Sequence, residues 1–164
     1  MARPTKFVQV TTSGFTNLET KLNSIFLQDV VLPAQTTIRR AADDVAFIAR
    51  EMSPLKTGSL ESAIEQPSRN IRREGFKVES MVWVNPRVWN PDDHIKVGDY
   101  MYEAHREITP YGNKKLGLMS RMKQDTVAVE VGGGFMDRAW EFSKPWIYPQ
   151  VVEAVKEALS KYNR

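Results

Sequence analysis

The chain has 164 residues, 41% of them hydrophobic and 26% charged, which is typical of one globular domain with a sizeable core. It contains no Cys, which excludes disulfides and Cys-based metal sites and favours a reducing compartment. The formal net charge of +3 is too small, and the basic pairs are too scattered, to indicate a dedicated nucleic-acid binder.

The N-terminal part of the sequence predicts a strand followed by two helices. Residues 6–12 alternate and are rich in β-branched types, which favours a short strand. Apolar residues recur at helical spacing from Phe15 to Phe26, and Pro33 interrupts this run. Proline fits the first turn of a new helix better than the middle of an old one. We therefore expect a short helix, a kink near residues 28–33 and a second helix.

This second helix is the clearest element in the sequence. Its apolar residues alternate spacings of four and three, and they are Ala34, Ile38, Ala41, Val45, Ile48 and Met52. The opposite face carries Arg39, Arg40, Asp43, Arg50 and Glu51. Ser53-Pro54 then ends the helix. The stripe fits a coiled-coil seam or a helix lying across its own sheet, and we expect the sheet because the pattern is short.

The middle of the chain predicts a short helix and a hairpin. Residues 57–64 form a turn with a short helical segment. Residues 76–84 alternate apolar and polar side chains, which predicts a strand with one apolar face. Residues 72–75 are the expected hairpin turn, so residues 69–72 are expected to pair with that strand.

The second half of the chain alternates loops with short elements. The expected order is a loop at 85–95, a helix at 98–107 with Asp99 near its start, a basic loop at 108–124, a strand at 126–131 and a helix at 135–142. Gly132-Gly133-Gly134 ends the strand, and Pro145 and Pro149 interrupt the segment after residue 142. We expect Pro149 to open a last helix with apolar residues Val151, Val152, Val155, Ala158, Leu159 and Tyr162.

These elements predict one α+β domain over residues 1–164. We expect a small antiparallel or mixed sheet of about four strands, packed against the long helix of the first half and a C-terminal helix. The loops at 85–97 and 108–124 are longer than a compact domain needs, and such loops are often functional. We therefore assign them to interactions with neighbouring subunits or partners.

No pattern in the sequence supports an enzyme. A metal site of a hydrolase could be built from His94, His105 and Glu107 with Asp92-Asp93. Their spacing, however, matches no familiar ligand pattern. The three consecutive glycines resemble a phosphate-binding loop but lack the Gly-Lys-Ser/Thr that completes one, so a flexible turn is preferred. No Gly-x-Ser-x-Gly elbow occurs. We expect no catalytic residue, no cofactor and no metal.

Aromatic and Met residues in or beside the loops of the second half indicate a protein interface, with a small satellite core under those loops as the alternative. The predicted interface residues are Trp89, Tyr100, Tyr102, Tyr111, Met119, Met122, Trp140, Trp146 and Tyr148. The first ten residues lack the apolar run of a signal peptide, and no stretch reaches the length of a bilayer span. We therefore expect a soluble protein that stays inside the cell in which it is made.

Residues 53–64 come directly after the predicted long helix and contain a distinctive series: Pro54, Thr57, Gly58, Leu60, Ser62 and Ile64. This series resembles the tail-completion family of lambda-like tailed bacteriophages, in which a long helix ends in proline, Thr-Gly, Leu and a Ser-Ile pair. Residues 14–22, 100–107 and 135–139 resemble further stretches of that family in the same order. Two departures are Arg106-Glu107-Ile108-Thr109 in place of Glu-Phe-Gly-Thr, and the insertion at 145–149.

The resemblance implies an α+β structural protein of the phage neck. Such a protein assembles as a ring, commonly a hexamer, at the head–tail interface and helps to join the tail to the DNA-filled head. Its implied partners are further copies of itself and other neck, connector and tail proteins, with DNA passing through the lumen without specific binding. Its implied location is the virion, and the host cytoplasm during assembly, without a membrane. The alternative is a small basic nucleic-acid-binding protein, motivated by a pI of about 9.2 and the basic loop at 113–123.

Overall fold

A computed structural model describes residues 20, 22–24, 26–65, 72–74, 77–90 and 94–161. The helical elements are the π-helical turn η1 (Leu27–Val31) and the α-helices α2 (Leu32–Met52), α3 (Ser59–Ala63), α4 (Val97–Arg106), α5 (Leu118–Gln124) and α6 (Phe135–Ser160). The strands are β1 (Ile64–Glu65), β2 (Arg72–Glu74), β3 (Lys77–Glu79), β4 (Trp83–Val84), β5 (Trp89–Asn90) and β6 (Ile95–Lys96). The predicted α+β class is confirmed, with a long helix in the first half and a second at the C-terminal end.

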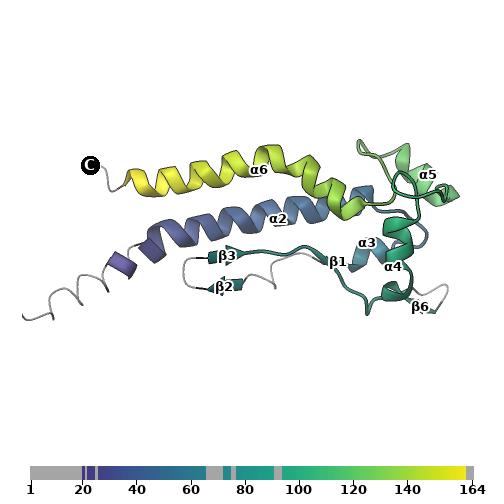
Figure 1. Ribbon diagram of the computed structural model, residues 1–164, viewed down its shortest axis with the longest axis horizontal. Helices are drawn as coiled ribbons and strands as arrows, with labels where there is room; N and C mark the ends of the chain where they lie inside the picture. The colour runs from purple at the N-terminus through teal and green to yellow at the C-terminus, as the bar shows by residue number, and fades with distance from the viewer. Residues whose placement is uncertain are drawn as a thin grey trace, which may run out of the picture.

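Two long helices, α2 and α6, run side by side along the length of the molecule (Figure 1). The β2–β3 pair lies along α2 on the side away from α6, and α3, α4, α5 and β6 gather at the end where α2 stops and α6 starts (Figure 1). We call this end the head end. Within the described residues, no helix combines the length and the apolar character needed to cross a bilayer.

The apolar face of α2 is wider than the predicted stripe. Ala41, Val45 and Met52 of that stripe are buried, and Ala46 and Ala49 beside them are fully buried as well. Small side chains allow two helices to pack closely, and the main partner of α2 is α6, with β1 and β3 making smaller contacts. The expected packing of α2 on its own sheet is therefore wrong, because strands of two or three residues offer too little apolar surface to cover a helix of this length.

The expected kink near residues 28–33 is a π-helical turn. The Leu32 N–H donates to the Leu27 carbonyl, five residues back, and the helix continues into α2 without leaving helical dihedral angles. Pro33 is the second residue of α2, and because it has no N–H the regular helical bonding is interrupted at this junction, directly after the π-helical turn. Residues 20, 22–24 and 26 are also helical. The predicted strand at 6–12 and the start of the first helix at Phe15 lie outside the described residues.

The C-terminal helix does not start at Pro149 as expected. α6 runs without interruption from Phe135 and contains both Pro145 and Pro149. Each proline removes one helical hydrogen bond, and the two stand one turn apart on an exposed side of the helix, where water can satisfy the freed carbonyls. α6 bends along its course (Figure 1), as proline-containing helices do.

The strands within the described residues form three separate antiparallel pairs, β1–β4, β2–β3 and β5–β6, and not one sheet of about four strands. The predicted strand at 76–84 is divided into β3 and β4, which pair with different partners. Arg72, Arg73 and Glu74, expected in the hairpin turn, form β2 and pair with β3.

Three further segments differ from their predicted structure. The predicted loops at 85–95 and 108–124 contain the β5–β6 pair and helix α5. Residues 126–131 form no strand, because the side chain of Gln124 hydrogen-bonds to backbone groups that a neighbouring strand would otherwise bind. Its Nε2 donates to Val129 O at 3.1 Å and its Oε1 accepts from Val131 N at 2.6 Å. The short helices predicted at 57–64 and 98–107 are confirmed as α3 and α4, with Asp99 accepting a bond from Lys96 N at 3.2 Å.

Replacing Val45 by Asp should destabilise the protein by about 3 kcal/mol or more, because it buries an unpaired carboxylate in the core. Urea unfolding measures the free energy. The control is Phe47→Asp on the same helix, whose side chain is 60% exposed, and it should cost less than about 1 kcal/mol. A Val45→Asp variant as stable as the parent would mean that this face of α2 is not core.

Candidate protein-interaction site

A buried lysine fixes the end of α2 at the head end. Lys123 of α5 donates to Ser53 O at 3.0 Å and to Arg50 O, and forms an ion pair with Glu61 of α3. The side chain of Lys123 is only 7% exposed, so these three oxygens replace the water that its charge loses. The last carbonyls of α2 carry a partial negative charge, and a cation there is favourable. Lys123 therefore binds α5 to the end of α2 and to α3.

The residues that carry the family resemblance form the connection between α2 and α3. Ser53 caps α2 through its Oγ, which donates to Arg50 O at 2.8 Å. Gly58 begins α3 with φ +81°, a left-handed conformation that glycine adopts without strain. Leu60 and Ile64 then turn into the core. The series that starts at Pro54 thus encodes one compact helix-to-helix connection.

The three consecutive glycines join the head end to the start of α6. The N–H groups of Gly132, Gly133 and Gly134 donate to Met52 O at 2.8 Å, Thr109 O at 2.8 Å and His105 O at 2.7 Å. Gly134 has φ +65°, and a Cβ there would lie 1.9 Å from the ring of Tyr111. Because all three N–H groups already donate to backbone carbonyls, this turn has none left to hold a phosphate.

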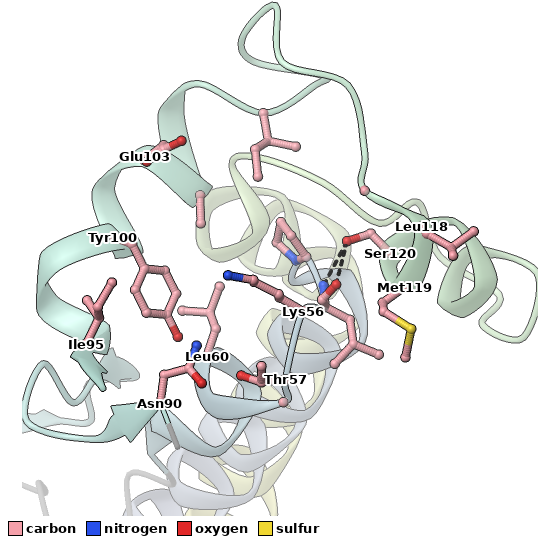
Figure 2. A pocket seen from close by; sticks show the side chains of 16 residues that line it. Lys56, Thr57, Leu60, Asn90, Ile95, Tyr100, Glu103, Leu118, Met119 and Ser120 are labelled. Atoms are coloured by element: carbon pink, nitrogen blue, oxygen red, sulfur yellow. Dashed lines mark hydrogen bonds between the residues drawn. The ribbon is translucent and has the colours of Figure 1, made fainter. Parts of the chain in front are cut away.

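A groove of about 500 Å³ opens beside the α2–α3 connection. Figure 2 shows Tyr100 and Ile95 on one side of it, and Leu118 and Met119 of α5 on the other. Ser120 holds α5 in place, because its Oγ donates to Leu55 O at 3.0 Å and accepts from Leu55 N at 2.9 Å. The groove is therefore a mainly apolar hollow between two rigidly attached helices.

Seven of the nine predicted interface residues are exposed on the surface. They are Trp89, Tyr102, Tyr111, Met119, Met122, Trp140 and Tyr148. The remaining two, Tyr100 and Trp146, are half-buried and pack against the core. Exposed large aromatic and Met side chains are typical of protein interfaces. The assignment of these residues to an interface stays a prediction, supported by their exposure.

Five of the nine predicted residues fall into two groups. Tyr100 and Met119 line the groove at the head end, where Lys96 Nζ lies 5.3 Å from the ring centre of the nearby Trp89. On α6, the rings of Trp140 and Tyr148 meet edge to face, with their centres 6.3 Å apart. The first group is carried by β5, α4 and α5, and the second by α6.

Sequence reasoning missed several exposed apolar residues. The largest omission at the head end is Leu118, which is 66% exposed, beside Met119 and Met122. Because residues 108–124 were expected to be a loop, the helical spacing of these three residues was not used. The other omissions are Leu22, Phe26, Leu32, Phe47, Met81, Trp83, Ile95, Phe142, Val152 and Leu159.

The described residues that were considered as metal ligands do not form a common cluster. Among the described residues, no group of three or more His, Asp or Glu side chains could hold a metal ion. His105 Nε2 lies 3.6 Å from Asp137 and its ring packs edge to face on Phe135, while Glu107 pairs with Lys114 at 2.7 Å. His94 is exposed, and Asp92 and Asp93 lie outside the described residues.

Part of the positive charge of the loop at 113–123 is neutralised within the chain. Hydrogen bonds to Glu103 and Glu107 raise the pKa of Lys114 to about 12, so it stays charged and paired over the ordinary pH range. Lys123 is buried and paired with Glu61. Two of the cations that motivated the nucleic-acid alternative are therefore engaged by carboxylates, which lowers its support.

Comparison with known proteins finds no matching family model, no matching curated sequence and no matching solved structure.

Replacing Gly134 by Ser should destabilise the protein by about 1–3 kcal/mol, because a side chain at φ +65° is strained and meets the ring of Tyr111. Thermal unfolding measures the loss. Gly117→Ser is the matched control, since Gly117 is also the residue before a helix but has φ −66° and open space around it. Serine is favoured there, so stability should be unchanged or slightly higher. Equal effects of the two substitutions would contradict this account of the turn.

Proposed function

We propose that this protein is a structural component of a phage neck, which forms a ring at the head–tail interface and helps to join the tail to the DNA-filled head. The proposal begins from the resemblance of residues 53–64 to the tail-completion family of lambda-like phages. The structural observation that supports it best is the presence of two groups of exposed apolar and aromatic side chains on different elements. One lies at the head end around Leu118 and Met119, and the other lies on α6 around Trp140 and Tyr148.

Two different surfaces are what a ring subunit needs. A closed ring uses a head-to-tail interface, so each subunit presents one patch to its left neighbour and a different patch to its right neighbour. Exposed aromatic and Met side chains supply the contact area that dominates such interfaces. Any further exposed residues at the head end would be available to other neck, connector or tail proteins.

A phage that lacks this gene should make DNA-filled heads and separate tails, or tails with a defective upper end, and few joined particles. Electron microscopy of the lysate distinguishes these outcomes. The control is the same phage with the gene supplied from a plasmid, which should restore joined virions. Normal infectious virions without the gene would refute the proposal. Empty heads alone would instead indicate that the protein acts in DNA packaging.

The segments at 85–97 and 108–124 should become protected from hydrogen exchange when the protein enters the assembled particle. Exposed Trp89 in the first segment, and Met119 and Met122 in the second, would be covered by a neighbour. Hydrogen exchange with mass spectrometry on free and assembled protein measures this change. The central turns of α2, already buried, serve as the internal control. Equal protection of the two segments in both states would contradict the assignment.

A further inference from the structure

Helix α5 is attached to the rest of the protein through its polar side. Its buried residues are Ser120 and Lys123, and the half-buried Gln124 lies on the same side, because residues three and four apart share one face of a helix. The side chains of all three bond to the backbone of other segments. Their partners are Leu55 for Ser120, Arg50 and Ser53 for Lys123, and Val129 and Val131 for Gln124.

The apolar side of α5 faces outward. Leu118, Met119 and Met122 are 66%, 45% and 55% exposed, and none of the seven residues of this fully described helix is both apolar and buried. A helix on a protein surface normally buries its apolar residues and exposes its charged ones. α5 has the reverse arrangement, with a lysine inside and two methionines outside.

This arrangement depends on the polar anchors. A helix of seven residues is too short to be stable alone in water, and α5 buries no apolar side chain that would hold it in place. Hydrogen bonds are directional, so bonds from one side of a helix fix its rotation about its own axis. The burial of Lys123 is favourable only while Glu61 and the two carbonyls replace its water.

The rotation of α5 decides what the head end presents. Leu118 and Met119 form the wall of the groove opposite Tyr100, and dashed lines in Figure 2 mark the two bonds of Ser120 that hold this wall. If α5 turned about its axis, its polar side would replace the wall. The apolar surface of the head end therefore exists only while the anchors are in place.

We propose that Lys123 is the positioning residue of the head-end surface, because it holds α5 with the apolar side outward from the end of α2. Ser120 and Gln124 support it from the same side of the helix. This inference rests on the proposed function, which assigns Leu118 and Met119 to a contact with a neighbouring subunit, and it adds the residue that places them. Lys123 is buried and acts through these side chains.

Hydrogen exchange with mass spectrometry on the full chain tests the proposal. Lys123→Met removes the charge and its three bonds. The amides of residues 121–127, which donate to Gly117 O, Arg121 O and Lys123 O, should exchange at least about tenfold faster. The buried amides of α2 at 41–49 should keep the rate of the parent. Arg121→Met is the matched control, since it also removes one positive charge from α5 but from an exposed side chain, and it should change neither rate.

Two further variants separate the carbonyls of α2 from the ion pair. Glu61→Gln keeps both carbonyl acceptors, so it should loosen α5 less than Lys123→Met does. The reversed pair E61K/K123E restores opposite charges but points a carboxylate at Arg50 O and Ser53 O, which are acceptors, so it should not restore protection. Full protection in the reversed pair would show that the ion pair alone holds α5, and would overturn the role of the end of α2.

Other results would overturn the proposal as a whole. Unchanged exchange of α5 in Lys123→Met would do so, and so would equal acceleration in α2 and α5, which would mean that Lys123 stabilises the entire fold. If Lys123→Met does not fold, Ser120→Ala replaces it, because it removes only the bonds to Leu55. It should accelerate the same α5 amides about threefold and leave α2 unchanged, and equal changes in both helices would again overturn the proposal.

The proposed function is tested separately in the phage. A phage that carries Lys123→Met should give few joined particles, as the phage without the gene does. A loosened α5 together with normal virions would leave the positioning role of Lys123 standing and refute the neck contact alone.

Discussion

The structure depends on the packing of α6 against α2. Ala46 and Ala49 of α2 and Ala139 of α6 are fully buried, and side chains this small allow the two helices to approach closely. No continuous sheet supports these helices among the described residues, since the strands occur only as short pairs. Two-stranded pairs are marginally stable on their own. The strands and the head-end helices therefore depend on a frame that two helices provide, and the remaining outer surface of that frame is available for contacts.

The sequence predicted the elements whose side chains repeat regularly and failed where one polar group or one distant contact decides the conformation. α2 was predictable because its apolar period is sustained. The alternation of Val127, Val129 and Val131 suits a strand equally well, but the amide of Gln124 bonds to the same backbone and no periodicity reveals this. Pro145 and Pro149 were expected to break the helix, yet both stand on its exposed side, where the lost bonds cost less. Which side of the helix carries the two prolines becomes clear only once the packing of that helix is known.

The sequence predicted the kind of site, a protein-interaction surface, but it did not identify all of the exposed residues. The aromatic and Met composition of the second half pointed to surface contacts, and most of the chosen residues are exposed. Tyr100 and Trp146 are half-buried against the core, because exposure on α4 and α6 depends on which side of the helix faces its neighbour. Leu118 was missed for the opposite reason, since its segment was expected to be a loop. Val152 and Leu159 were expected in the last helix, but they were assigned to its apolar set as a whole, without separating the side that α2 covers.

The glycine turn before α6 has a consequence for the order in which the chain folds. Its three N–H groups bond to carbonyls at the end of α2, in the 108–110 segment and at the end of α4, all of them far back in the sequence. None of these bonds can form until residues 132–134 have been made, and α2 lacks its main packing partner until most of α6 has been added. Contacts between residues so distant in sequence fold slowly. During synthesis the side of α2 that packs against α6 therefore stays uncovered until the last helix has been made.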